Sequence, residues 1–196
     1  MTRLLLLVLI VCMWVQNGFA QTGKTSPAFT PQAGTEIEGL AFKPFTTTDQ
    51  FGRTIQFYLS KSKAEPGKAL PLVVCIQGSG SQSLFWEMET PKGKMIVSGG
   101  PEAVAVRDFG DQLRVLVVEK PGVEFLKQPS RPGGATEGSA EYNREFSLDR
   151  WTAAVNAAVK SAVQIEGVLP KPLLALGHSE GGQVACPVRM MEPVFL

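Results

Sequence analysis

The sequence predicts an α/β fold on a mostly parallel sheet, and three observations predict it. Residues 72–76 are a continuous apolar run and residues 113–118, apart from Arg114, are a second one; such runs are typical of strands that helices cover on both faces. A helical pattern over 101–109 lies between them, so strand, helix and strand follow one another as in a parallel crossover. A further apolar run, 173–176, leads through a glycine-rich turn into another predicted helix.

The first twenty residues are predicted to be a secretory signal. Arg3 precedes an apolar stretch from Leu4 to Val15, and Gly18-Phe19-Ala20 supplies small residues for cleavage after Ala20. A transmembrane anchor is the alternative, but such a stretch spans about 18 Å of helix against about 30 Å of hydrocarbon. The sequence therefore predicts a secreted or periplasmic protein whose mature chain has no membrane span.

The composition indicates one globular domain without nucleic acid as a partner. The chain has 196 residues and is 44% hydrophobic, which suits a single core. Its formal net charge of +1 depends on Arg3, and removal of the signal leaves equal numbers of basic and acidic side chains. The sequence leaves open whether Cys75 and Cys186 pair. No cluster has metal-ligand spacing, so neither a metal nor a cofactor is expected.

The segments before the parallel strands are predicted to form a leader and a hairpin. Residues 21–38 are predicted to be a disordered leader, since they are rich in small and polar residues without an apolar period. The domain is then expected to span 39–186. Strands at 40–45 and 54–59, joined by a turn at 49–52, are predicted to form an antiparallel hairpin at the start of the sheet.

A helix is predicted after a long surface excursion over 122–146, a segment that is rich in proline and glycine. Ser147 is the predicted N-cap. The apolar positions recur at helical spacing and are Leu148, Trp151, Val155, Ala158 or Val159, and Ala162. Gly167 and Pro170 are expected to end this helix before the strand at 173–176.

The turn Gly177-His178-Ser179-Glu180-Gly181-Gly182 has the residue types of a nucleophile elbow. A serine between a strand and a helix presents its hydroxyl clear of the sheet, and the first helical amides point towards an anion formed there. Because the turn is tight, Gly177 and Gly181 must be nearly free of side chains. The alternative is that Ser179 only caps the helix, but the flanking glycines and the strand favour the nucleophile geometry.

The loop Gln77-Gly78-Ser79-Gly80 is the second candidate segment, at the end of the strand at 72–76. A tetrahedral intermediate places negative charge on an oxygen that two backbone N–H groups can stabilise, and loss of one donor costs about 3–4 kcal/mol. The candidate oxyanion donors are the amides of Ser79 and Glu180. The alternative is that this segment is only a loop that ends a strand.

From about residue 40 to 185 the sequence resembles the alpha/beta-hydrolase family, in its serine esterase and peptidase branches. The resemblance depends on residues 75–80, on Glu119-Lys120-Pro121-Gly122-Val123 and on the turn at 177–182. It implies an eight-stranded sheet with Ser179 as the nucleophile and an ester or peptide as the small-molecule substrate.

Only the N-terminal portion of the family pattern is matched, because the family places an acidic residue and a histidine base later in the chain than the serine. The only histidine here is His178, whose imidazole we expect to point away from the hydroxyl of Ser179. The sequence leaves Glu119 open between a functional and a surface carboxylate. Pro187 is expected to end the last helix early, and 187–196 is expected to be an atypical tail, as a premature stop or a shifted frame would make it.

Two functions fit these observations. The first is a serine hydrolase that cleaves an ester, amide or peptide bond through an acyl-serine intermediate, with little or no turnover for the chain as given because two triad members are absent. The alternative is a secreted, non-catalytic binding module that uses 122–146 as its contact surface. In either case the strand at 173–176 is expected to be an unpaired apolar edge, which favours self-association.

Overall fold

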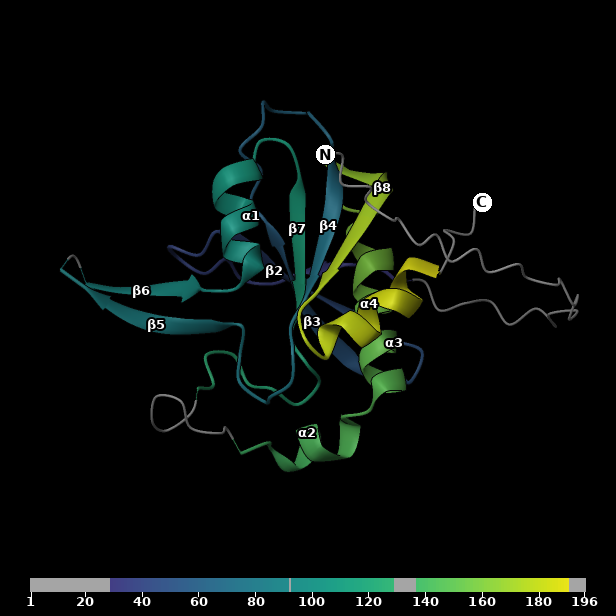
Figure 1. Cartoon of the computed structure of the whole chain (residues 1–196). Helices are drawn as coiled ribbons and strands as arrows, with labels where there is room; N and C mark the ends of the chain where they lie inside the picture. The colour runs from purple at the N-terminus through teal and green to yellow at the C-terminus, as the bar shows by residue number, and fades with distance from the viewer. Residues whose placement is uncertain (1–28, 92, 129–136, 191–196) are drawn as a thin grey trace, which may run out of the picture.

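The computed structural model describes residues 29–91, 93–128 and 137–190 (Figure 1). The predicted signal and residues 191–196 of the predicted tail lie outside this part of the chain. A six-stranded sheet forms the centre, in the order β1-β2-β3-β7-β4-β8. Its strands are β1 (Gln32–Ala33), β2 (Phe42–Thr48), β3 (Thr54–Ser60), β4 (Leu70–Ile76), β7 (Arg114–Val118) and β8 (Val168–Gly177).

The sheet is mixed, so the prediction of mostly parallel strands is correct for only one half of it. β7, β4 and β8 run parallel to one another. The other half is antiparallel, from β1 through β2 and β3 to the junction with β7. The predicted hairpin is confirmed, although β2 continues further than expected, until Thr48 pairs with Thr54 beside the turn.

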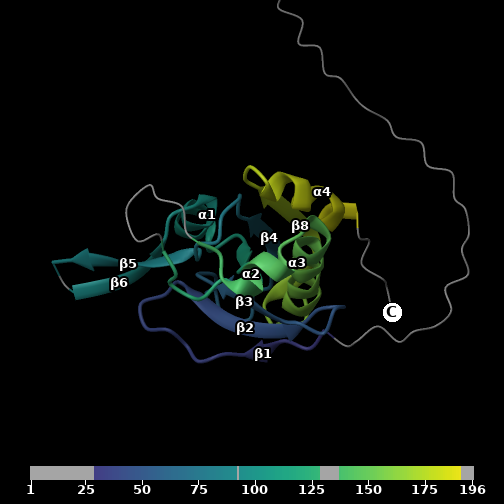
Figure 2. The same ribbon diagram turned by 90° about the horizontal axis from the view of Figure 1, so that it is seen from below.

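Helices cover both faces of the sheet (Figures 1 and 2). α1 (Pro101–Phe109), which has the predicted bounds, packs on one face; α3 (Leu148–Ala162) and α4 (Gly181–Met190) pack on the other. Alternation along β7 divides its side chains between the two cores, with Val117 on the α1 side and Leu116 on the α3 side. This burial on both faces is what the apolar runs 72–76 and 115–118 predict.

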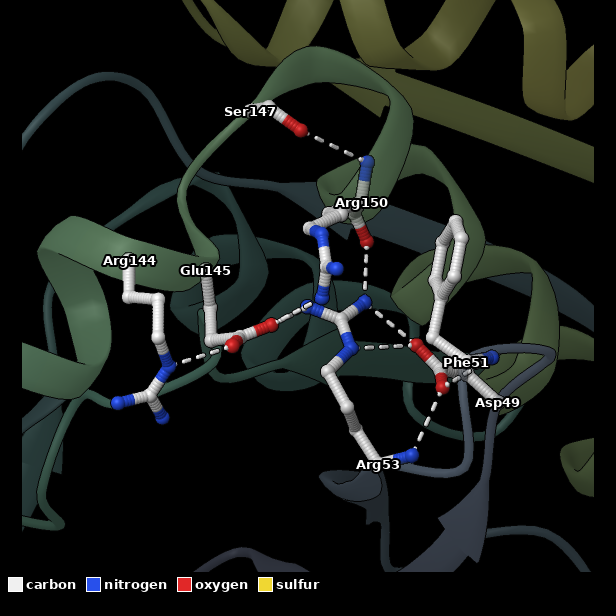
Figure 3. A network of polar contacts seen from close by, with 7 residues as sticks. All are labelled: Asp49, Phe51, Arg53, Arg144, Glu145, Ser147 and Arg150. Atoms are coloured by element: carbon white, nitrogen blue, oxygen red, sulfur yellow. Dashed lines mark hydrogen bonds and ion pairs between the residues drawn. The ribbon is translucent and has the colours of Figure 1, made fainter.

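The N-terminal end of α3 is fixed by its predicted cap and by a network of charges (Figure 3). The hydroxyl of Ser147 accepts a hydrogen bond from the amide of Arg150 at 3.3 Å. Arg53 donates through Nε to Asp49 at 2.8 Å and through Nη2 to the carbonyl oxygen of Arg150 at 2.7 Å. Glu145, which ends the short helix α2 (Ala140–Glu145), pairs with Arg150. The network therefore joins the hairpin turn to the start of α3.

The predicted helical face of α3 is confirmed except at its first position. Leu148 is 48% exposed, so it does not belong to the core. Trp151, Val155, Ala158 and Ala162 are buried. Leu148 is the first residue of α3, whereas the later positions belong to the core that α3 forms with the sheet.

Two segments that the sequence predicts to be irregular contain structure. The prediction of a disordered leader over 21–38 is wrong for its described part, because β1 pairs with β2 and Ser161 donates to the carbonyl oxygen of Phe29. The surface excursion over 122–146 contains α2, whose Tyr142 is buried. Short elements of this kind lack a readable apolar period, since other elements supply the packing partners.

A separate two-stranded ribbon, β5 (Phe85–Thr90) and β6 (Gly93–Ser98), is absent from the sequence prediction. It projects from the body of the molecule in both views (Figures 1 and 2). Phe85 at its base is buried in the α1-side core, whereas the cross-strand neighbours Met88 and Met95 are 44% and 46% exposed. The strands lack a core face along most of their length, which is why no apolar alternation marks them.

The C-terminal elements extend beyond their predicted bounds. β8 begins at Val168 and contains Pro170. A proline is compatible with this strand because β8 is the last strand in the sheet order, so one side of its backbone needs no ladder partner. The prediction that Pro187 ends the last helix is wrong, because α4 continues to Met190. Val184 and Val188, one turn apart, are both buried in the core, and this packing retains the helix although proline lacks an amide.

Candidate active site

The loops that follow the parallel strands β4, β7 and β8 meet at the carboxyl end of these strands (Figure 1). Cys75 of β4 pairs in register with Val117 of β7 and with Leu176 of β8, so the three strands end at the same level. In open α/β sheets, ligands bind at the carboxyl ends of the strands. The carboxyl end of the parallel strands therefore brings together the two segments that the sequence predicts to carry the chemistry.

Ser179 occupies the turn between β8 and α4 with an unusual backbone conformation. Its φ is +54°, a value in the left-handed region that residues with a Cβ adopt at a cost. Leu126 is the other non-glycine residue with positive φ in the described part of the chain. The turn is closed by a hydrogen bond of 2.9 Å from the amide of Gly181 to the carbonyl oxygen of His178. Strained residues of this type cluster at functional sites.

Gly177 and Gly181 allow the close approach of β8, β4 and α4. A Cβ on Gly177 would lie 2.2 Å from the carbonyl oxygen of Gly181, and a Cβ on Gly181 would lie 2.3 Å from that of Ile76. Both contacts are to backbone atoms, which cannot rotate away as a side chain can. Gly182 differs from them, because its nearest contact would be 3.9 Å from the carbonyl oxygen of Gly177. The spacing of small residues around Ser179 thus has a steric cause.

The loop after β4 passes directly beside Ser179. A Cβ on Gly78 would lie 3.0 Å from Nδ1 of His178 and 3.1 Å from Cβ of Ser179. The backbone amides of Ser79 and Glu180 donate to no other group within the described residues. Ser79 is exposed and Glu180 is half-buried. The two segments that meet at Ser179 therefore each carry an unused backbone donor.

A pocket of about 340 Å³ opens beside Ser179. Its lining comes from the loop after β4, the base of the ribbon, the first turn of α1 and the turn after β8, and includes Gln77, Ser79, Trp86, Glu102, His178 and Ser179. The buried amide nitrogen of Gln77 has no hydrogen-bond partner among the described residues. Glu102 accepts from the amide of Gly100 at 2.9 Å. The pocket thus combines hydrogen-bonding groups with an indole ring.

His178 borders the same pocket as Ser179, and its Nδ1 lies beside Gly78. The expectation that the two side chains leave on opposite sides assumes a regular strand, whereas the positive φ of Ser179 turns the chain out of β8. Within the described part of the chain, no hydrogen bond joins the imidazole to the Ser179 hydroxyl. A general base has to lie within hydrogen-bonding distance of the proton that it removes, so His178 is not placed as that base.

Glu119 is a buried carboxylate, so the alternative of a surface carboxylate is wrong. It is 3% exposed, directly after β7. Its Oε1 accepts hydrogen bonds from the hydroxyl of Ser83 at 2.5 Å and from the amide of Leu84 at 3.1 Å. Burial raises the pKa of Glu119 to about 7, although both hydrogen bonds act in the opposite direction. Glu119 thereby anchors the loop between β4 and the ribbon.

Lys120, which lies near the carboxyl end of β7, is a residue of the site to which sequence reasoning assigned no role. Its side chain is fully buried, and its Nζ donates to the carbonyl oxygen of Gly78 at 2.7 Å and to that of Gly80 at 3.2 Å. It also forms an ion pair of 3.1 Å with Glu180. Burial lowers the pKa of Lys120, while the hydrogen bond and the charge of Glu180 raise it. A charged pair directly after the apolar run 115–118 was the signal that could have identified it.

The cysteines do not pair in this structure, and the described residues contain no metal cluster. Cys75 and Cys186 are both free. Burial in β4 raises the pKa of the Cys75 thiol to about 12, so it behaves as a small apolar side chain. The described residues hold no group of three or more histidine, cysteine, aspartate or glutamate side chains that could bind a metal ion. Over the same residues, no helix has the length and apolar character needed to cross a bilayer.

No protein-family model and no curated protein matches this sequence, whereas solved structures do. The chain is similar to a puromycin hydrolase (TM-score 0.51, 16% identity), of which it covers 22% with 89% of its own length. It is also similar to a candidate acetyl xylan esterase from Bacteroides fragilis (0.57, 15%), covering 46% with 86% of its length. An acylaminoacyl peptidase (0.51, 14%) is matched over 22% of its length by 80% of this chain.

All three structures are alpha/beta hydrolases, so the resemblance that the sequence suggests is confirmed at the level of the fold. The identities are low, and they show a common architecture. The chain spans less than half the length of each of these proteins. What the site does must therefore be argued from its own residues.

Proposed function

We propose that this chain, which has the alpha/beta-hydrolase fold, carries the nucleophile and the oxyanion donors of a serine hydrolase. The observation that carries the proposal is the conformation of Ser179. Its φ of +54° between β8 and α4 holds the serine on a sharp turn, as a nucleophile elbow requires. A serine that only caps a helix has extended backbone angles, so strain at this residue argues against a mere cap.

In the proposed reaction, Oγ of Ser179 attacks the carbonyl carbon of an ester, amide or peptide bond and gives up its proton to a base. The carbonyl π electrons move to the oxygen, whose negative charge the amides of Ser79 and Glu180 stabilise. Both amides lack another acceptor within the described residues, which leaves them available. Collapse of the intermediate expels the alcohol or amine, which takes up a proton, and water then hydrolyses the acyl-serine.

We propose a small-molecule ester or amide as the substrate, and the pocket and the names of the similar proteins support this class. Those names span a hydrolase, an esterase and a peptidase, which fits a small-molecule ester or amide. The pocket beside Ser179 offers Trp86 and the amide of Gln77 to bind the acyl or leaving group. Neither a metal nor a cofactor has a role in the proposed reaction.

We infer that the chain as given turns over substrate slowly. Its only histidine is His178, which forms no hydrogen bond with Ser179 in the described part of the chain. Glu119 and Lys120 are held by other groups, Ser83 for the carboxylate and the loop carbonyls for the ammonium. Without a positioned base, the hydroxyl loses an acceleration of about 10²–10⁴-fold.

Covalent labelling tests the proposed nucleophile more directly than turnover. A fluorophosphonate phosphonylates an active-site serine as the P–F bond breaks and the hydroxyl proton leaves with fluoride, and mass spectrometry of the digested protein locates the adduct. We expect slow labelling at Ser179 and none in the Ser179→Ala variant. Ser62→Ala, which changes an exposed serine, serves as the matched control and is expected to label like the unmodified chain. An adduct at another serine, or an equal yield in Ser179→Ala, would refute the proposal.

No observation in the described residues favours the alternative of a binding module that uses 122–146. The described end of this segment turns inwards, since Tyr142 is buried and its hydroxyl donates to the carbonyl oxygen of Gly80 at 3.2 Å. This part of the segment therefore supports the loop after β4.

A further inference from the structure

The ammonium group of Lys120 has all of its hydrogen-bonding capacity directed at the two segments that meet at Ser179. A lysine ammonium has three donors. Here they are used by the carbonyl oxygens of Gly78 and Gly80 and by the carboxylate of Glu180. The ring of Phe146 covers the same nitrogen, with its centroid 4.8 Å away. Burying a lysine without such partners would be unfavourable, so this arrangement is specific.

We propose that Lys120 is a positioning residue that orients the oxyanion-hole peptide, and this inference rests on the proposed function. The carbonyl of Gly78 and the amide of Ser79 belong to one peptide unit. In a planar trans peptide the C=O and N–H bonds point in opposite directions. By holding the Gly78 oxygen at 2.7 Å, Lys120 turns the Ser79 N–H away from the protein interior. A rotated peptide would place a carbonyl where the donor has to be.

The third contact of Lys120 couples the second donor to the first. Glu180 contributes its backbone amide to the proposed oxyanion hole, and its side chain lies 3.1 Å from Nζ of Lys120. One buried cation therefore ties together the loop after β4 and the turn after β8. A methionine of similar length could fill the space, but it has no donor for either carbonyl oxygen.

The loop itself is adapted to this contact at Gly80. Its φ of +115° is a conformation that residues with a Cβ rarely adopt, and a Cβ there would lie 2.4 Å from Oε1 of Gln82. This conformation accompanies the carbonyl that faces Lys120. Tyr142 donates to the same carbonyl oxygen at 3.2 Å but not to that of Gly78. Tyr142 therefore provides a control that separates support of the loop from orientation of the Ser79 peptide.

The test compares Lys120→Met with Tyr142→Phe in the full chain by nuclear magnetic resonance. The carbonyl carbon shift of Gly78 reports its hydrogen bond, and the residual dipolar coupling of the Ser79 N–H bond reports the direction of that bond. We expect both to change in Lys120→Met and both to keep their unmodified values in Tyr142→Phe. Unchanged values in a folded Lys120→Met variant would overturn the proposal.

A measurement on the unmodified protein covers the case in which Lys120→Met does not fold. A hydrogen-bond scalar coupling between Nζ of Lys120 and the carbonyl carbon of Gly78 is expected, and its absence would overturn the proposal. Fluorophosphonate labelling then links orientation to chemistry, with a rate about 10²-fold lower in a folded Lys120→Met variant. An unmodified chain that resists labelling would count against the proposed nucleophile, while the resonance data would still decide the role of Lys120.

Discussion

Burial changes the chemistry of the two charged residues that follow β7. Lys120 donates to three acceptors, whereas Glu119 accepts from two donors and is buried. The sequence places both residues at the end of an apolar strand, and this much could be predicted. It could not show their burial, because the groups that contact them are distant in the chain: residues 78–84 for both, and also Phe146 and Glu180 for Lys120.

The raised pKa of Glu119 predicts that the free energy of unfolding falls as the pH rises. The pKa is about 7 in the folded chain and near 4.5 without the fold, so the folded state holds the proton more tightly. This contribution is fully present below about pH 4.5 and is lost as the pH rises through 7. Chemical denaturation at pH 5 and pH 8 should show a loss of up to about 3 kcal/mol from this group.

Glu119→Gln removes this titration but keeps an oxygen that can accept from Ser83 and Leu84. We therefore expect its free energy of unfolding to change less between pH 5 and pH 8 than that of the unmodified chain. Glu124→Gln, which alters an exposed carboxylate nearby, is the matched control and should retain the original pH dependence. Equal pH dependence in all three proteins would contradict the assignment.

Elements with their own local pattern could be predicted from the sequence, and elements that depend on distant partners could not. The hairpin has turn residues between alternating strands, and α3 has a serine cap before a helical apolar face. The ribbon formed by β5 and β6 has no core face along most of its length. The extension of α4 past Pro187 depends on the burial of Val188 against the sheet and α3. A proline in a sequence predicts the end of a helix only when such packing is absent.

The junction between β8 and α4 should tolerate a methyl group at one glycine and not at another. Gly181→Ala would place its Cβ 2.3 Å from the carbonyl oxygen of Ile76, so we expect a loss of about 3 kcal/mol in the free energy of unfolding. Gly182→Ala meets only ordinary contact at 3.9 Å and lies inside α4. Since alanine favours a helix over glycine, this control should be neutral or stabilising by up to about 1 kcal/mol.

Urea denaturation of the two variants measures both effects. The same pair also tests the site, because the displaced Ile76 carbonyl adjoins the loop that carries Ser79. Fluorophosphonate labelling should therefore be slower in Gly181→Ala than in Gly182→Ala. Equal stability of the two variants would show that the junction is looser than its contacts indicate.

The molecule as a whole has its candidate site next to an open side of the sheet. Within the described residues, β8 is the last strand in the sheet order and contributes the residues that lead to Ser179. Leu174 and Leu176 on this strand are 57% and 49% exposed. Val104 on α1 is also 47% exposed. A sheet edge with unpaired backbone groups and apolar side chains is a template for pairing with another chain.

We therefore propose that the chain self-associates through β8. Sedimentation velocity at micromolar concentration should show species larger than a monomer. Leu176→Lys places a charge on the edge, where a second strand would bury it, and should shift the distribution towards the monomer. Leu148→Lys is the matched control, because Leu148 is equally exposed, at 48%, but lies on α3. If the unmodified chain sediments as a single monomeric species, or if both variants change it equally, the edge of β8 is not the contact.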